Sequence, residues 1–326
     1  MTDPVSMTEL WRGPFLESVH TGHAVICNAD GEIVQTWGDP DKVVLSRSAS
    51  KMIQALPLIT SGAADAMSLT PKHLALACSS HRGTKMHTDL VRDWLGRMDL
   101  SDSDLRCGAH PPYSDDTYHA MIRAEESPCQ WHNNCSGKHT GFLTLSRHLG
   151  AGPEYLETDH PVQKAVLEAY ERVTGEPSPG YGVDGCSAPN FASSLHGMAR
   201  AMAHFAVSPE DSPEARLHQA MRQHPEYVAG NERPCTELMR ATGGKVVIKT
   251  GAEGFYNAIL PDQKLGVALK ITDGTTRASE CAIAAILVKL GALEPDHPAV
   301  TSLMNAPIRN VRGIQTGWIR PAPPLL

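Results

Sequence analysis

The chain has 326 residues, which is enough for one large domain or two closely packed ones. Hydrophobic residues make up 41% and charged residues 20%, an ordinary globular balance that argues against disorder over most of the length. The formal net charge of −7 argues against a nucleic-acid partner and against an anionic membrane surface.

The start of the chain does not resemble a secretion signal. Residues 1–15 contain Asp3, Pro4 and Glu9 in place of a basic start and an apolar core. No apolar run reaches membrane-spanning length, and the best candidate, residues 281–288, is short. We therefore expect a cytoplasmic protein with no membrane partner.

Eight cysteines are present, and an even number could form disulfides. In a large chain without a secretion signal, reduced thiols are the better interpretation, and most of them are then small buried hydrophobes. Neither Cys-x-x-Cys nor HExxH occurs, despite 16 histidines. Any metal site must therefore combine ligands that are far apart in the sequence.

The first elements are predicted to be a β-hairpin and a short helix. The hairpin has strands at 23–28 and 32–37 with a turn at Asp30-Gly31. An apolar helix is expected at 52–59, where Pro57 should kink or shorten it. Helical periodicity then dominates the middle of the chain, with helices expected at 85–98, 138–149, 160–174, 190–206, 212–224 and 234–242.

Alternation with period two replaces the helical pattern in the last third of the chain. It predicts three antiparallel strands at 245–250, 255–260 and 265–272. A closing helix is expected at 275–290, and the Pro-rich end beyond it is expected to be a surface tail.

This order of elements predicts an α+β fold. An antiparallel sheet is built from both ends of the chain, about 1–70 and 243–326. The mostly helical middle, about 71–242, is then an insertion. We expect residues 1–326 to act as a single functional unit.

Ser48 and Lys51 are the first residues that could carry chemistry. They are three residues apart at a helix start, so their side chains share one face. A serine hydroxyl is a weak nucleophile unless a base takes its proton, and a lysine serves as that base when burial or a second cation lowers its pKa. Taken alone, the pair is more simply an N-capping serine and a solvated lysine.

A matching element near the other end favours the catalytic interpretation. Lys249-Thr250-Gly251 closes a predicted strand, where glycine allows a close approach. Ser-x-x-Lys early and Lys-Thr-Gly late is the pattern of penicillin-binding proteins and serine β-lactamases. The turn at Ser79-Ser80 either supplies a second hydroxyl, held by a second lysine, or is only a polar turn.

A third cluster contains thiols. Cys135 and Lys138 would share one face at a helix start, and Cys186 lies in a second Gly- and Ser-containing segment. Two thiolates with a nitrogen ligand and a water make a tetrahedral Zn²⁺ site. Lysine is a rare ligand because it must lose its proton, so His139 is the more conventional nitrogen. From spacing alone, two buried cysteines are the better interpretation of the pattern.

These segments together resemble the class 3, Rhizobium etli-type, L-asparaginases over nearly the whole chain. The segments that carry the resemblance are Arg47-Ser48-Ala49-Ser50-Lys51, Leu76-Ala77-Cys78-Ser79-Ser80-His81, Asn134-Cys135-Ser136-Gly137-Lys138-His139, Asp184-Gly185-Cys186, Gly251-Ala252-Glu253-Gly254 and Ala268-Leu269-Lys270-Ile271.

The resemblance implies a serine β-lactamase-like fold with two Ser-Lys pairs. Ser48 pairs with Lys51, and Ser80 pairs with a lysine from the C-terminal strands. We assign that lysine to Lys249, with Lys270 as the alternative. The implied reaction is hydrolysis of L-asparagine through an acyl-enzyme.

The resemblance also implies a homodimer with about one Zn²⁺ per chain, bound by Cys135, Lys138 and Cys186. His139 and Asp184 then contact the substrate or support the ligands. Arg47 would hold the substrate carboxylate or form a structural salt bridge. The alternatives are a glutaminase, a penicillin-recognising hydrolase, or a non-catalytic zinc-binding protein.

Overall fold

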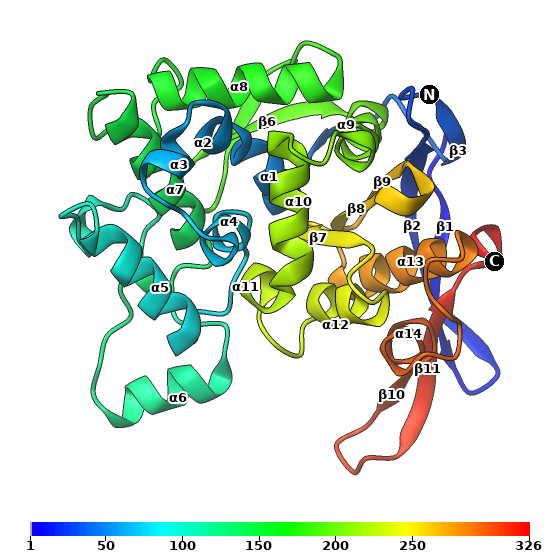
Figure 1. Ribbon diagram of the computed structural model, residues 1–326. Helices are drawn as coiled ribbons and strands as arrows, with labels where there is room; N and C mark the ends of the chain where they lie inside the picture. The colour runs from blue at the N-terminus through cyan, green and yellow to red at the C-terminus, as the bar shows by residue number, and fades with distance from the viewer. Residues whose placement is uncertain (1) are drawn as a thin grey trace. The chain divides into compact units, whose positions relative to one another are not determined.

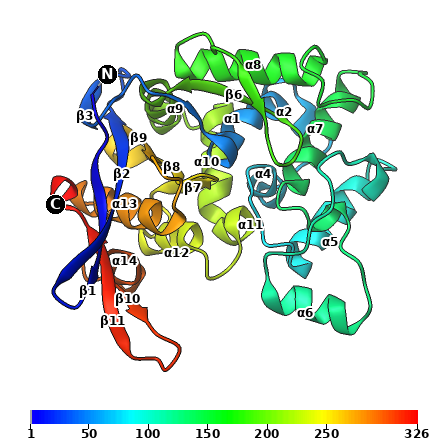
Figure 2. The same cartoon turned by 180° about the vertical axis from the view of Figure 1, so that it is seen from behind.

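The computed structural model describes residues 2–326, which divide into two compact units (Figures 1 and 2). Within the described residues, unit 1 comprises residues 2–49, Ser193–Val207 and Glu237–Leu326, and unit 2 comprises Ser50–Ala192 and Ser208–Thr236. The first boundary between the units falls after residue 49. Each unit is described below on its own.

Unit 1 contains an eight-stranded antiparallel sheet built from both ends of the chain, in the order β10-β11-β1-β2-β9-β8-β7, with β3 also paired to β2. The sequence-predicted α+β class is confirmed. The strands of this sheet are β1 (Val5–Arg12), β2 (Phe15–Cys27), β3 (Ile33–Trp37), β7 (Val247–Gly251), β8 (Phe255–Leu260), β9 (Leu265–Ile271), β10 (Ala306–Arg309) and β11 (Gln315–Pro321).

Helices α9 (Leu195–Val207) and α13 (Thr276–Lys289) cover opposite faces of this sheet (Figure 1). On β9, Gly266 faces α9 so closely that a Cβ would collide with the α9 backbone. On β1, Thr8 Oγ1 donates to the carbonyl of Ala278 in α13 at 3.1 Å. The strand register places Thr8 and Gly266 on opposite faces, because side chains alternate along a strand. Unit 1 is therefore a helix–sheet–helix sandwich.

Unit 2 is mostly helical and is organised around one buried helix, α7 (Ser136–His148), which packs against α2, α3, α4, α5 and α8. Gly137 allows the closest of these contacts, because a Cβ there would collide with the Leu76 carbonyl of α4. The remaining helices are α1 (Lys51–Gln54), α2 (Leu56–Thr60), α3 (Ala63–Ala66), α4 (Pro71–Ala77), α5 (Lys85–Gly96), α6 (Asp115–Arg123), α8 (Pro161–Thr174), α10 (Pro213–Gln223) and α11 (Pro225–Ala229).

Three elements lie at or near the boundaries of the units. These are β4 (Val43–Leu45), the short β6 (Pro189–Ser194), which pairs with β5 (Tyr181–Val183), and α12 (Pro234–Ala241). Among the helices of residues 2–326, none has both the length and the hydropathy needed to cross a membrane.

Several expected elements need correction. The helix expected at 190–206 begins only at Leu195, because residues 189–194 form β6. The helix expected at 52–59 is divided at Ala55, as expected from Pro57. The C-terminal segment is not a surface tail, because it contributes α14 (Pro298–Met304), β10 and β11.

Candidate active site

In unit 1, the segment that carries Ser48 lies over the end of β7 and β8. Asn257 Nδ2 of β8 donates to the carbonyl of Ala49 at 3.1 Å. On β7, Gly251 faces the carbonyl of Ser46 with no room for a Cβ. Ser48 is half-buried, and the preceding residue, Arg47, takes a left-handed conformation at φ +51°. A tight turn therefore holds the Ser48 backbone against the edge strand.

Lys249, rather than Lys270, belongs to this part of the sheet. Lys249 is directly opposite Asn257, the residue that holds the Ala49 carbonyl, so both side chains share one face. It is completely buried, and its Nζ donates to the carbonyl of Thr250 at 2.8 Å. The serine-bearing turn and the lysine of Lys-Thr-Gly are thus neighbours within unit 1.

Lys270 lies further along the sheet. Its Nζ donates to the carbonyls of Glu253 at 2.7 Å and Ile271 at 2.5 Å, and burial lowers its pKa. It lines a cavity of about 790 Å³ with His23, Lys42 and Arg47.

In unit 2, Lys51 is completely buried at the start of α1 and contacts several candidate groups. Its Nζ is 3.2 Å from Ser80 Oγ and 3.1 Å from Cys135 Sγ, and it donates to the carbonyl of Ser79. Ser80 follows α4 in a turn that is fixed by a 2.8 Å backbone hydrogen bond to Val228. One amine therefore contacts a hydroxyl and a thiol at the same time.

Cys135, Lys138 and Cys186 come together beside Lys51. Cys135 precedes α7, Lys138 lies in its first turn, and Cys186 follows β5; each is at most 4% exposed. Lys138 Nζ is 3.1 Å from Cys186 Sγ. Residues 135 and 138 thus converge in unit 2 with residue 186, which is far from them in the sequence.

The protonation of each group in this cluster affects the pKa of its neighbours. A hydrogen bond from Cys135, together with the charge of Lys138, lowers the pKa of Cys186 well below the ordinary thiol value, against the cost of burial. The same hydrogen bond raises the pKa of Cys135. Burial lowers the pKa of Lys138, but the charges of Cys186, Cys135 and Asp184 together outweigh that effect and raise it. These pKa shifts favour the thiolate form of Cys186 and the ammonium form of Lys138.

The donor set suits a single Zn²⁺. Two thiols and one amine lie within contact of one another in a buried space, and zinc binds sulfur and nitrogen donors. Within residues 2–326, no group of three His, Cys, Asp or Glu side chains offers an alternative metal site. The amine must lose its proton to bind, so the ammonium–thiolate pair describes the metal-free arrangement.

Two further candidate residues differ in accessibility. Asp184 is half-buried, and its Oδ1 accepts the backbone N–H of Gly185 at 2.8 Å. His139 is completely buried, and its Nδ1 is 3.0 Å from the hydroxyl of Tyr155. Tyr155 cannot be recognised as a partner of His139 from the sequence, because one aromatic residue in a loop between two helices forms no pattern.

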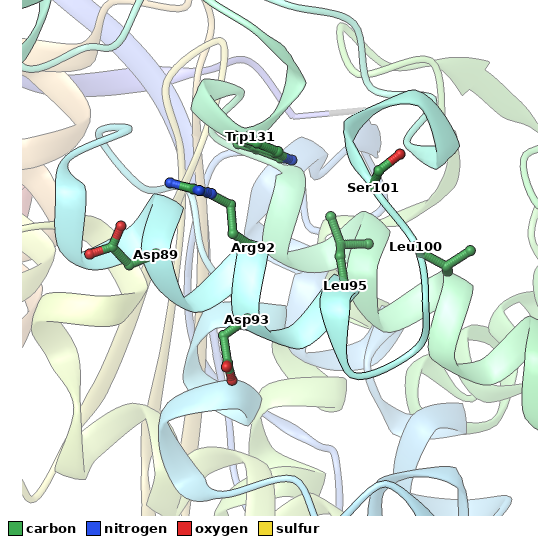
Figure 3. A pocket seen from close by; sticks show the side chains of 7 residues that line it. All are labelled: Asp89, Arg92, Asp93, Leu95, Leu100, Ser101 and Trp131. Atoms are coloured by element: carbon green, nitrogen blue, oxygen red, sulfur yellow. The ribbon is translucent and has the colours of Figure 1, made fainter.

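Unit 2 contains a cavity of about 510 Å³ between α5 and the segment around Trp131 (Figure 3). Arg92 lies over the Trp131 ring at 4.7 Å. The hydroxyl of Ser101, which lines the cavity, is hydrogen-bonded to the side chains of Ser103 and Asp104. No lysine lines it, so the buried cluster is the better candidate for serine–lysine chemistry.

The sequence model of the family described as L-asparaginase II matches residues 8–321. The chain belongs to the L-asparaginase II family. This asparaginase is therefore an amidohydrolase, as the sequence predicted. No curated protein sequence matches the chain significantly.

The asparaginase is also similar to solved structures of low sequence identity. A β-lactamase from Mycobacterium bovis shares 14% identity at a TM-score of 0.48, with 82% of this chain and 94% of that chain covered. A putative β-lactamase from Bacteroides dorei shares 13% at a TM-score of 0.42, covering 78% and 87%. An octameric penicillin-binding protein homologue from Pyrococcus abyssi shares 13% at 0.43, covering 84% and 74%.

Proposed function

We propose that the chain hydrolyses L-asparagine to L-aspartate and ammonia through a serine-bound acyl intermediate. The observation that carries this proposal is the 3.2 Å approach of Nζ of the completely buried Lys51 to Oγ of the half-buried Ser80. Membership of the L-asparaginase II family supports the substrate. A buried amine next to a hydroxyl is the arrangement that a serine–lysine mechanism requires.

Lys51 is the proposed proton acceptor. It follows Ser48 by three residues in the chain and contacts Ser80, so it serves a nucleophile at either position. We assign the attack to Ser48, with Ser80 and Lys249 as the second pair. The serine oxygen attacks the side-chain amide carbon while the Lys51 amine takes the hydroxyl proton. That proton passes to the leaving nitrogen, ammonia departs, and water then hydrolyses the aspartyl ester.

Cys135, Lys138 and Cys186 are the proposed ligands of one Zn²⁺ per chain. The bound ion would supply a Lewis acid that helps to hold the substrate. The nucleophile remains a serine in this proposal. The protein's own contribution is to keep two sulfurs and one amine together in a buried space before the metal arrives.

Arg47 and Asp184 are proposed to bind the α-carboxylate and α-ammonium groups of asparagine. Both are half-buried, and their charges complement those of the amino acid. His139 was expected to join them, but its ring is completely buried.

We further propose that the chain forms a homodimer, which light scattering would check. We also propose that it is cytoplasmic, which cell fractionation would check.

The decisive experiment measures ammonia released from L-asparagine, L-glutamine and no substrate, with an acid quench to trap a serine ester for intact-mass analysis. We expect release from asparagine and a mass increase located on Ser48 or Ser80. Faster release from glutamine would identify a glutaminase. Ring opening of a penicillin without ammonia release would favour the penicillin-recognising alternative. Metal binding without any turnover would indicate a zinc-binding protein.

A further inference from the structure

The cavity of about 790 Å³ in unit 1 contains polar side chains that the proposed reaction does not use. All of its lining residues lie between 2 and 47 or between 253 and 272, so the cavity belongs to unit 1 alone. His23 of β2 is directly opposite Lys270 of β9, so their side chains leave the same face of the sheet. These two groups therefore form one wall of the cavity.

The ring of His23 presents a hydrogen-bond donor to this cavity. The backbone N–H of Asp39 donates to His23 Nδ1 at 2.8 Å, so the proton of the neutral imidazole is on Nε2. Burial lowers the pKa of His23, which favours that neutral form. His23 is only 5% exposed, and Nε2 has no hydrogen-bond partner within residues 2–326. Gly38 packs so closely against the ring that a Cβ would collide with Nδ1. The turn thus holds the ring in place with one N–H left for a ligand.

Lys270 adds a positive charge beside that donor. Its Nζ donates to the carbonyls of Glu253 and Ile271, its hydrogen-bond partners in the described part of the chain. An ammonium group has three N–H donors, so one remains for a ligand. Lys42 also lines the cavity, and its charge helps to lower the pKa of both His23 and Lys270. Neighbouring donors of this kind are complemented by a carboxylate.

The cavity also contains a buried carboxylate, that of Asp39. Asp39 is 6% exposed, and its Oδ1 accepts the backbone N–H of Asp41 at 3.1 Å. No cation forms an ion pair with it among residues 2–326. A buried charge needs a partner of opposite sign, so Asp39 favours a ligand with an ammonium group and repels a multiply charged anion. Donor and acceptor groups together match a zwitterion.

Apolar side chains complete the lining. Val43 and Leu45 are two residues apart in β4, so they share one side of the strand, and they are 57% and 41% exposed. Pro4 lines the cavity as well. An apolar group of the ligand would cover this surface, which otherwise faces water.

We propose that this cavity binds a free α-amino acid with an apolar side chain. His23 and Lys270 hold its carboxylate, Asp39 holds its ammonium group, and Val43 and Leu45 contact its side chain. This site goes beyond the proposed reaction, because a ligand without a side-chain amide occupies it and is not turned over.

Equilibrium dialysis of the wild-type chain with radiolabelled L-leucine tests the proposal without turnover. We expect one leucine per chain. L-Leucinamide, which lacks the carboxylate, and 4-methylpentanoate, which lacks the ammonium group, should each compete at least about 10-fold more weakly than unlabelled leucine. Absence of leucine binding would overturn the proposal. Equal competition by 4-methylpentanoate would also overturn it, since the site would then recognise an anion alone.

Substitutions locate the bound leucine. Asp39→Asn and His23→Phe should each weaken its binding by about 10- to 100-fold, because each removes a partner of a charged group of the ligand. His23→Gln, which keeps an N–H donor, should restore part of the affinity. Asp262→Asn, at a carboxylate lining another cavity of unit 1, is the control. Equal binding in Asp39→Asn, His23→Phe and the control would refute the site.

A competition experiment separates this site from that of the substrate. Arg47, the proposed contact of the substrate carboxylate, also lines the cavity. Ammonia release from L-asparagine gives its KM, and dialysis gives the concentration at which asparagine displaces leucine. We expect leucine to remain bound at asparagine concentrations that saturate turnover. Displacement at the KM would show that the cavity is the substrate site and would overturn the proposal. In a chain without turnover, the dialysis results still decide whether leucine binds.

Discussion

The amine of Lys51 lies 3.1 Å from the sulfur of Cys135. The same amine contacts Ser80, so the proposed proton acceptor and a proposed metal ligand are direct neighbours. A metal that binds Cys135 as a thiolate would change the charge next to Lys51. Metal content and serine reactivity are therefore expected to depend on each other, although the proposed nucleophile is a serine.

The serine assignments predict that turnover depends on the hydroxyls of Ser48 and Ser80 and not on that of Ser79. Ser48→Ala and Ser80→Ala should each lower asparagine turnover by about 10³-fold or more, because no other hydroxyl replaces the nucleophile or its partner. Ser79→Ala is the matched control, since the buried Ser79 hydroxyl has no hydrogen bond within residues 2–326. Ammonia release and circular dichroism are the measurements. A larger loss in Ser80→Ala, with acyl trapping only at Ser80, would reverse the two roles.

Replacing Lys249 by methionine should lower turnover much more than replacing Lys270. Lys249→Met should lose about 10²-fold or more in turnover, because Lys249 lies beside the segment that carries Ser48. Lys270→Met should stay within a few-fold of the wild type, since its amine is bonded to the Glu253 and Ile271 carbonyls. Initial rates and thermal unfolding distinguish catalytic from structural loss. The opposite order would assign the second pair to Lys270.

The thiol cluster predicts about one zinc per chain by elemental analysis, as for a single site. Cys135→Ala and Cys186→Ala should each release the metal and raise KM, while measurable turnover remains at saturating asparagine. Cys129→Ala, at a half-buried thiol outside the proposed ligand set, should keep its zinc. Complete loss of turnover that returns when metal is added would instead favour a metal-hydroxide mechanism.

Three buried histidines should lower the free energy of unfolding in acid. Burial lowers the pKa of His73, His87 and His218 to about 4, from an unfolded value near 6.5. Between these values the unfolded chain binds protons that the folded chain does not, so stability falls as pH drops from 6.5 toward 4. Above pH 6.5 this contribution is fully present.

His218→Leu tests this account. Relative to the wild type, it should lose less stability between pH 7 and pH 5, because one of the groups that titrates on unfolding is gone. His119→Leu, at an exposed histidine of α6, is the control. Urea unfolding at the two pH values gives the comparison. An unchanged acid dependence in His218→Leu would contradict the assignment.

Replacing Gly251 by alanine should disturb unit 1 locally. The added Cβ would collide with the carbonyl of Ser46, and the turn that carries Ser48 would have to move away from β7. We expect a lower melting temperature and a loss of turnover. Gly243→Ala is a control for space, since nothing lies near a Cβ there, although its positive φ adds some strain. Normal turnover in Gly251→Ala would show that the turn tolerates displacement.

Periodicity was sufficient to predict β7, β8 and β9, because each strand is bounded by turn residues and alternates cleanly. It failed at residues 189–194, where small and apolar residues fit a helix as well as a buried strand, and pairing with β5 decides for the strand. The C-terminal strands were missed because Pro307 and Pro321 argue against strands in sequence, yet β10 is an edge strand and Pro321 ends β11.

Sequence spacing also predicts only part of the candidate site. Cys135 and Lys138 could be placed together from their spacing, since both belong to the start of one helix. Their approach to Cys186 followed from resemblance rather than from any local pattern. The relation of His139 to Tyr155 depends on a loop closing over α7, which no spacing rule describes.

Unit 1 is drawn from three separate stretches of the chain, and this has a consequence for synthesis on the ribosome. The inner strand β2 leaves the ribosome early, but its partner β9 and the β11 strand that pairs with β1 are among the last residues made. Until then β1 and β2 expose unpaired edges, which favour association with other chains. Unit 2 can form its helices during this interval. A nascent chain halted before residue 265 should consequently be bound by chaperones through its first strands.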